Sequence, residues 1–85
     1  MKMPDNQMSP VDVEGTIRAA GDSEELVRNL VNAGEHSEEI HKTIGRNTEH
    51  LSIILGRQEI IDSQSPRLDG FREAITLGVD FIAAV

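Results

Sequence analysis

The feature that most constrains this chain is a run of residues that recur at alternating spacings of four and three between positions 33 and 61. The run consists of Ala33, Ser37, Ile40, Ile44, Asn47, Leu51, Ile54, Gln58 and Ile61. These spacings place side chains on one narrow stripe of an α-helix, which is the pattern of a coiled-coil seam. A stripe this narrow buries its apolar groups only against another helix, so we expect a neighbouring helix to cover it.

The composition favours packing between helices over a compact aromatic core. The chain has 85 residues, of which only Phe71 and Phe81 are aromatic. A chain of this length buries only about 60% of the surface that its unfolded form exposes, so a lone monomer is expected to be marginally stable. Aliphatic contacts between helices, including those of other subunits, are the expected source of stability.

Charge and composition exclude several classes of function. The net charge of −7 repels phosphate backbones and anionic lipid, and the arginines are scattered, so we expect no binding to nucleic acid. The absence of cysteine excludes disulfides and thiolate metal sites. No aliphatic run, Ile53-Ile54-Leu55 included, is long enough to predict a signal peptide or a membrane span. We therefore expect the protein to be cytoplasmic when synthesised.

The first part of the chain predicts an arm and two short helices. Residues 1–8 have no helical period and indicate an extended N-terminal arm. Short helices are expected over residues 9–34, the first beginning at Ser9-Pro10 and stopping at Gly21. Asp22 and Glu25 have the spacing of a capping box and predict the second start, with Gly34 as its end.

Residues 35–85 predict a long central coiled-coil-like helix and a C-terminal helix packed on it as a hairpin. The central helix should run from Ser37 to Leu55 or Ile61, and Gly56 is the favoured break. An alternative is a break at Gly45, after which Asn47 caps a fresh helix start.

Ser65-Pro66 opens the C-terminal helix. Its hairpin contacts are expected from apolar residues at helical spacing, which are Leu68, Phe71, Ile75 and Ile82. Two outcomes are open at this stage. The apolar C-terminal turns lie in a subunit interface, or the hairpin closes one monomeric core.

The seam also predicts how copies of the chain associate. Its expected interface residues are Ile40, Ile44, Asn47, Leu51, Ile54, Gln58 and Ile61. Mixed isoleucine and leucine layers favour trimers or tetramers over dimers in parallel coils, so a homotrimer is the favoured partner arrangement. His36, His41 and His50 lie beside the seam and suggest pH-sensitive association.

No catalytic or metal-binding constellation is evident. Glu38 and His41 have the i, i+3 spacing of a di-metal helix, but such a site needs a second motif and two further glutamates. No Ser, His and Asp arrangement and no glycine-rich phosphate loop is present. We expect no enzymatic activity, no cofactor and no metal.

One resemblance concerns the C-terminal half. The segments are 47–55, 59–61 and 68–75, followed by Gly78 and Phe81-Ile82-Ala83. Together they are similar to small uncharacterised proteins encoded among tailed-phage structural genes. The resemblance implies an all-helical virion or assembly component without enzymatic activity, with other virion proteins as partners and the virion as its final location.

The resulting hypothesis is a non-enzymatic, self-associating structural protein, such as a minor capsid, fibre or tail component of a bacteriophage. An alternative is a soluble adaptor or assembly chaperone that binds a partner helix through its apolar face. A regulator-type dimer is disfavoured by the acidic charge.

Overall fold

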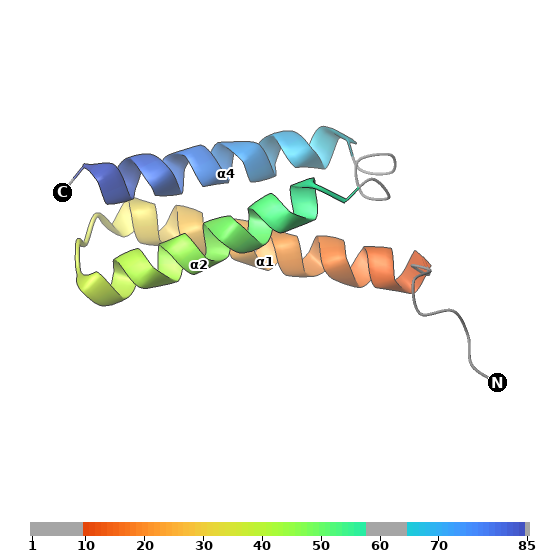
Figure 1. Ribbon diagram of the computed structural model, residues 1–85, viewed down its shortest axis with the longest axis horizontal. Coiled ribbons are helices and arrows are strands. Elements are labelled where there is room, and N and C mark those ends of the chain that lie inside the picture. The colour runs from red at the N-terminus through yellow and green to blue at the C-terminus, as the bar shows by residue number, and fades with distance from the viewer. Residues whose placement is uncertain (1–9, 58–64, 85) are drawn as a thin grey trace.

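Three packed helices make up the part of the chain that the structure, a computed structural model, describes. This part comprises residues 10–57 and 65–84, with side chains described over 13–57 and 67–84. The helices are α1 (Pro10–Ala33), α2 (Glu38–Leu55) and α4 (Ser65–Ala83). α2 runs antiparallel to α1 and α4 (Figure 1). The expected all-α class is confirmed for these residues.

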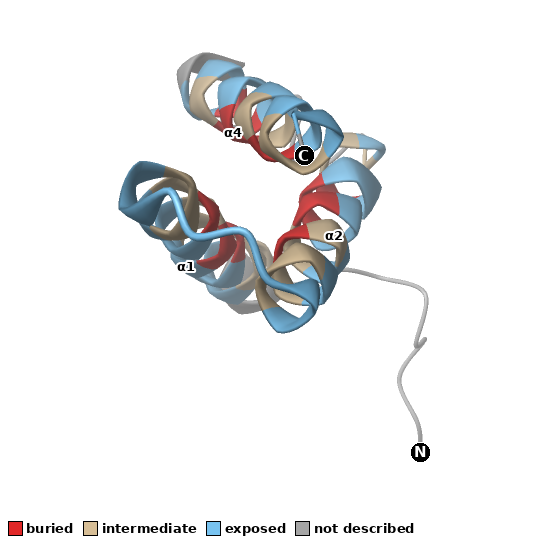
Figure 2. Ribbon diagram, turned by 90° about the vertical axis from the view of Figure 1, so that its left-hand side faces the viewer, coloured by how far each residue is buried: buried red, intermediate tan, exposed pale blue. Residues whose placement is uncertain are grey.

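The core lies on the common axis of the three helices, and each helix turns its buried face toward it (Figure 2). The buried apolar residues are Ala20, Val27, Ile44, Leu51, Ile54, Leu68, Phe71 and Ala74. α1 contributes to the same core as α2 and α4. The arrangement is a three-helix bundle among the described residues, and α4 packs on α1 as well as on α2.

α1 is one continuous helix, so the predicted stop at Gly21 and restart at Asp22 are wrong. At Gly21 the missing side chain leaves space for another helix, because a Cβ there would lie 2.5 Å from an Arg67 guanidinium nitrogen of α4. Ser23, which would follow a helix start, is buried inside the bundle. Gly21 and Ser23 therefore face the other helices and do not mark a helix end.

Local end signals set the boundaries of α2, as the sequence predicted. α1 ends before Gly34, which has a positive φ of 73° that glycine adopts without strain. The Ser37 side chain accepts a hydrogen bond of 3.1 Å from the Ile40 amide and caps α2. α2 ends at Gly56, whose amide donates to the Ile53 carbonyl at 3.1 Å.

The alternative helix start at Asn47 is wrong. α2 continues through Gly45, and the Asn47 side-chain amide donates to the Thr43 carbonyl within the same helix at 2.9 Å. An interior asparagine that bonds back to the preceding turn cannot also cap a new helix at the same point.

At Gly78, α4 closely approaches both other helices. A Cβ at this position would lie 2.7 Å from Thr48 Cγ2, 2.9 Å from Ile44 Cγ2 and 3.3 Å from Val27 Cγ1. The contact atoms come from both α1 and α2. The absence of a side chain at Gly78 therefore allows α4 to sit in the groove between the other two helices.

Two glycine substitutions test this packing. Gly78→Ala should destabilise the bundle by about 1–3 kcal/mol, because the added methyl group has no space. The matched control is Gly45→Ala in α2, where a Cβ would meet nothing within 4 Å. This control should stabilise the fold by about 0.5–1 kcal/mol through helix propensity. Urea unfolding followed by circular dichroism measures both, and equal stability of the two variants would contradict the close approach at Gly78.

Candidate functional site

The predicted oligomer seam is largely covered by the chain itself. Ile44 and Leu51 are completely buried, and Ile54 retains 3% of its surface exposed. Ile40 and Asn47 are half-buried. Gln58 and Ile61 lie outside the described residues. α1 and α4 therefore shelter Ile44, Leu51 and Ile54 within the chain. The trimer through this stripe stays a prediction.

The predicted hairpin residues divide into two groups along α4. Leu68 and Phe71 are buried in the core. Ile75 and Ile82 are half-buried and lie at its edge. α4 packs on both α1 and α2, but its apolar face is wider than the area that the bundle covers.

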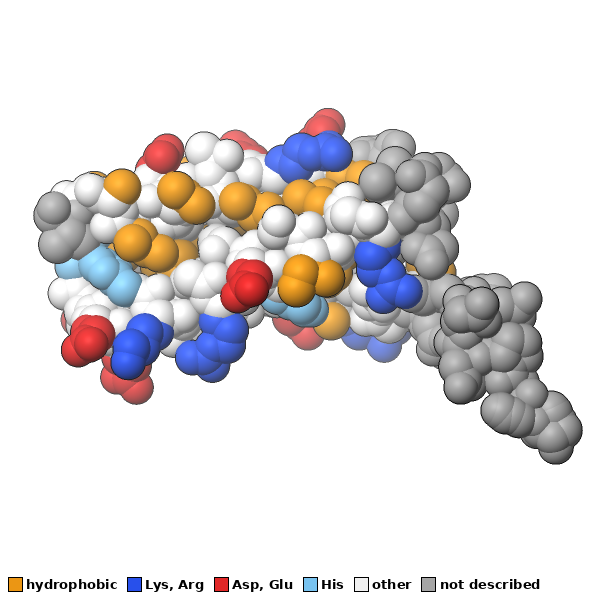
Figure 3. Space-filling view, viewed as in Figure 1, with side chains coloured by type: hydrophobic (Ala, Val, Ile, Leu, Met, Phe, Trp, Pro, Cys, Tyr) orange, Lys and Arg blue, Asp and Glu red, His pale blue; other side chains and the backbone are white. Residues whose placement is uncertain are grey.

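Exposed apolar side chains mark the surface that this wider face creates. Val79 is 53% exposed, and Figure 3 shows hydrophobic side chains in a row along α4. The residues three and four positions before and after Val79 on this helix are all uncharged. They are Ile75, Thr76, Ile82 and Ala83. We call these five residues the Val79 strip. A contiguous uncharged strip on a chain with net charge −7 is a candidate contact surface.

The other exposed apolar side chains lack such surroundings. Ile53 is 62% exposed, but Glu49 and His50 precede it by one turn of α2. Leu26 is 38% exposed on α1, one turn after Asp22. Single apolar groups among charged neighbours are normal on a protein surface. The Val79 strip is therefore the stronger candidate for a contact surface.

An aromatic cluster lies where the α1–α2 loop meets the end of α4. The His36 ring stacks on Phe81 with centroids 3.9 Å apart and an interplanar angle of 10°. His36 Nδ1 and His41 Nε2 are 3.0 Å apart, and His41 meets the Phe81 ring edge-on. The sequence analysis placed both histidines beside the seam but did not bring them together, because a loop residue has no helical periodicity to locate it.

A buried serine and a histidine connect α1 to α2. Ser23 Oγ lies 2.8 Å from His50 Nδ1, and Ser23 is only 5% exposed. A serine–histidine pair resembles part of a catalytic triad, but a hydroxyl enclosed between helices has no space for a substrate. The pair is a structural hydrogen bond that satisfies a buried polar group.

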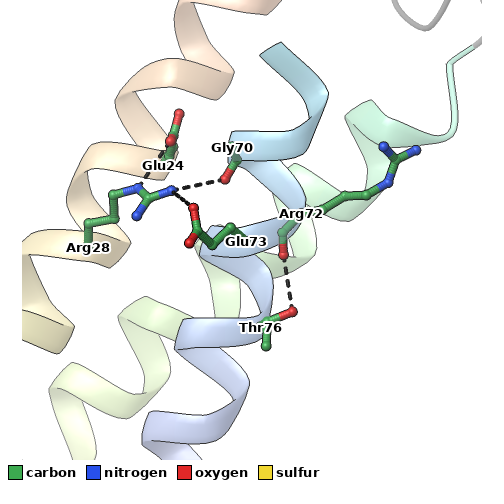
Figure 4. Close-up of polar contacts among 6 residues, drawn as sticks. All are labelled: Glu24, Arg28, Gly70, Arg72, Glu73 and Thr76. Carbon is green, nitrogen blue, oxygen red and sulfur yellow. Dashed lines mark hydrogen bonds and ion pairs between the residues drawn. The ribbon is translucent and has the colours of Figure 1, made fainter. Parts of the chain in front are cut away.

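Arg28 connects α1 to α4 (Figure 4). Its Nε donates to Glu24 Oε2 at 3.0 Å, and its terminal NH2 group donates to Glu73 Oε1 at 3.0 Å and to the Gly70 carbonyl at 3.3 Å. The hydrogen bond to Glu73 raises the pKa of the Arg28 guanidinium. Burial of the guanidinium lowers this pKa by a smaller amount, and the hydrogen bond and charge of Glu24 raise it further. Because this pKa is raised, the stability that charged Arg28 adds to the fold is fully present at pH values below the ordinary pKa of arginine. It is lost only in strong alkali.

The predicted spacing of Glu38 and His41 does not form a metal cluster. Within the described residues, no group of three or more His, Cys, Asp or Glu side chains converges as metal ligands would. Glu38 is exposed in the first turn of α2. Its negative charge there interacts favourably with the positive end of the helix dipole. None of the described helices is long and apolar enough to cross a membrane.

Comparison of the chain with protein-family models, with curated proteins and with solved structures finds no match.

Neighbouring isoleucines on α2 test whether the bundle buries its own seam. Ile54→Ala should destabilise the fold by about 2–5 kcal/mol, because it leaves a cavity in the core. Ile53→Ala removes the same atoms from an exposed position and should change stability by less than about 0.5 kcal/mol. Urea unfolding at two protein concentrations measures both. If the effect of Ile54→Ala depended on concentration, Ile54 would belong to an interface between subunits instead.

The Arg28 bridge gives a second stability prediction. Arg28→Gln should destabilise the fold by about 1 kcal/mol, a value kept small because the side chain is 32% exposed and screened by solvent. Arg72→Gln is the matched control, since Arg72 lies 3.8 Å from Asp69 in a largely exposed pair. It should change stability by less than about 0.5 kcal/mol. Thermal unfolding at low and high salt measures the stability of both variants. The difference in stability between them should become smaller at high salt, because salt screens the ion pairs. Equal effects of the two substitutions would contradict the bridge.

Proposed function

We propose that this protein is a non-enzymatic structural protein that works by protein–protein contact, with the Val79 strip as its contact surface and a second copy of the chain as its first partner. The observation that supports the proposal is the exposure of Val79 at the centre of an uncharged helix face. Ile75 and Ile82 of the strip pack partly against the core, whereas Val79 is largely exposed. The strip therefore extends the apolar face of α4 beyond the area that the bundle covers.

Charge makes the location of this strip significant. Two copies that each carry a net charge of −7 repel one another, so a contact between them is best made where acidic groups are absent. Each residue of the Val79 strip meets this condition. A straight strip on a helix can also pair with its own copy across a two-fold axis, which is the commonest symmetry of homo-oligomers.

A role in a bacteriophage virion, as a minor capsid, fibre or tail component, is the finer form of the proposal. It is supported by the resemblance of the C-terminal half to small proteins of tailed-phage structural genes. α4, which carries the proposed contact surface, lies within that half. Mass spectrometry of purified phage particles tests this form by detecting the chain in the finished particle.

The second candidate is an adaptor or assembly chaperone that binds the helix of a different protein. The enclosed core favours it, because a bundle whose described helices already cover their own apolar seam does not require copies of itself for stability. An amphipathic partner helix would lie along the same Val79 strip. The two candidates therefore share a surface and differ in the occupant.

Matched lysine substitutions test the surface and distinguish the occupants. If the wild-type chain self-associates, Val79→Lys should weaken that association at least about tenfold, because a charge would be buried at the contact. Ile53→Lys is the control, with the same charge change at a more exposed isoleucine outside the strip. Sedimentation equilibrium over a range of concentrations measures both variants.

Two results would contradict self-association through the strip. One is a wild-type chain that remains monomeric at every concentration, which would leave the adaptor role. The other is equal weakening by Val79→Lys and Ile53→Lys, which would place the contact outside the Val79 strip.

A further inference from the structure

The two histidines beside Phe81 form the best-defined cluster of metal-ligating side chains in the described residues. His36 belongs to the loop after α1, and His41 belongs to the first turns of α2. His36 is exposed and His41 is half-buried, so an ion can reach both from solvent. The nitrogens that face each other, Nδ1 of His36 and Nε2 of His41, are 3.0 Å apart.

We propose that His36 and His41 together bind one divalent transition-metal ion, such as Zn²⁺, Ni²⁺ or Cu²⁺, through these two nitrogens. Metal–nitrogen bonds of about 2.0–2.1 Å place two imidazole nitrogens of a tetrahedral or octahedral site roughly 2.9–3.4 Å apart. The observed separation of 3.0 Å falls in this range. To share an ion, both rings turn away from the line that joins the two nitrogens, so that the ion replaces their hydrogen bond.

Packing restricts both ligands before an ion arrives. The His36 ring lies flat on Phe81, at 3.9 Å between centroids, and this stack restricts its rotation. His41 is held by the helix backbone and by its edge-on contact with the same ring. Because both rings are already confined, less conformational entropy is lost on binding than for two free histidines.

The proton balance of the site is simple. Imidazole binds a metal in its neutral form, with one ring nitrogen protonated and the other carrying a lone pair. In the hydrogen-bonded pair, one of the two facing nitrogens carries a proton. On binding, that proton moves to the other nitrogen of the same ring through solvent, so two neutral rings bind the ion without net proton release or redox change.

The donor set predicts which ions are selected. Two imidazoles favour Zn²⁺, Ni²⁺ and Cu²⁺ over Mg²⁺ and Ca²⁺, which prefer oxygen ligands. Water fills the remaining coordination positions, because the described residues bring no third His, Asp or Glu into such a group. An open site of this kind holds the ion reversibly, and the bound ion links the α1–α2 loop to α2.

Isothermal titration calorimetry of the full chain, prepared without a histidine tag, tests the site with NiCl₂ and with ZnCl₂. We expect saturable binding of one ion per chain and no binding of Mg²⁺. His36→Ala and His41→Ala should each weaken binding at least about tenfold. His50→Ala is the matched control and should bind as the wild type does, since His50 is paired with Ser23 instead.

Thermal unfolding provides an independent measurement. Ni²⁺ should raise the unfolding midpoint of the wild type and of His50→Ala, because an ion that binds the folded chain stabilises it. Ni²⁺ should leave the unfolding midpoints of His36→Ala and His41→Ala unchanged. Circular dichroism of both variants checks that they are folded. Unweakened binding in either variant, or equal loss in all three, would overturn the proposal.

Discussion

The close approach of α4 to the other two helices is the constraint on which the rest of the structure depends. The chain has two phenylalanines and no larger aromatic residue, so its core is filled mainly by aliphatic groups that must lie near one another. Gly78 lets α4 meet Val27 of α1 and Thr48 of α2 at the same level. Without that approach the apolar stripe of α2 would stay open on one side.

The enclosure of that stripe moves the functional question from α2 to α4. A seam that α1 and α4 already cover has no apolar area left for a subunit at Ile44 or Leu51. α4 is apolar over a wider arc than its two neighbours cover, and Val79 lies at the exposed side of that arc. The apolar surface left for a partner is therefore on α4 and not on the seam of α2.

The sequence predicts helix ends better than it predicts what covers each helix. Ser37 and Gly56 set the ends of α2 by local hydrogen bonds, which depend only on nearby residues and can be predicted from the sequence. Gly21 has a local stop signal but a tertiary role, since the Arg67 side chain passes over it. The histidine pair also escaped prediction, because stacking on Phe81 joins residues 45 positions apart. Periodicity locates apolar faces but does not say which neighbour covers them.

Directional polar contacts decide which neighbour lies on which side of α1. Apolar burial is non-directional, so a bundle with α2 and α4 exchanged would bury much the same residues. Ser23 lies on one side of the buried face of α1 and reaches His50 of α2. Arg28 lies on the other side and reaches Glu73 of α4. In the exchanged bundle Arg28 would face α2 and Ser23 would face α4, which leaves Ser23 buried without its histidine. These two contacts therefore favour the observed arrangement of α2 and α4 around α1.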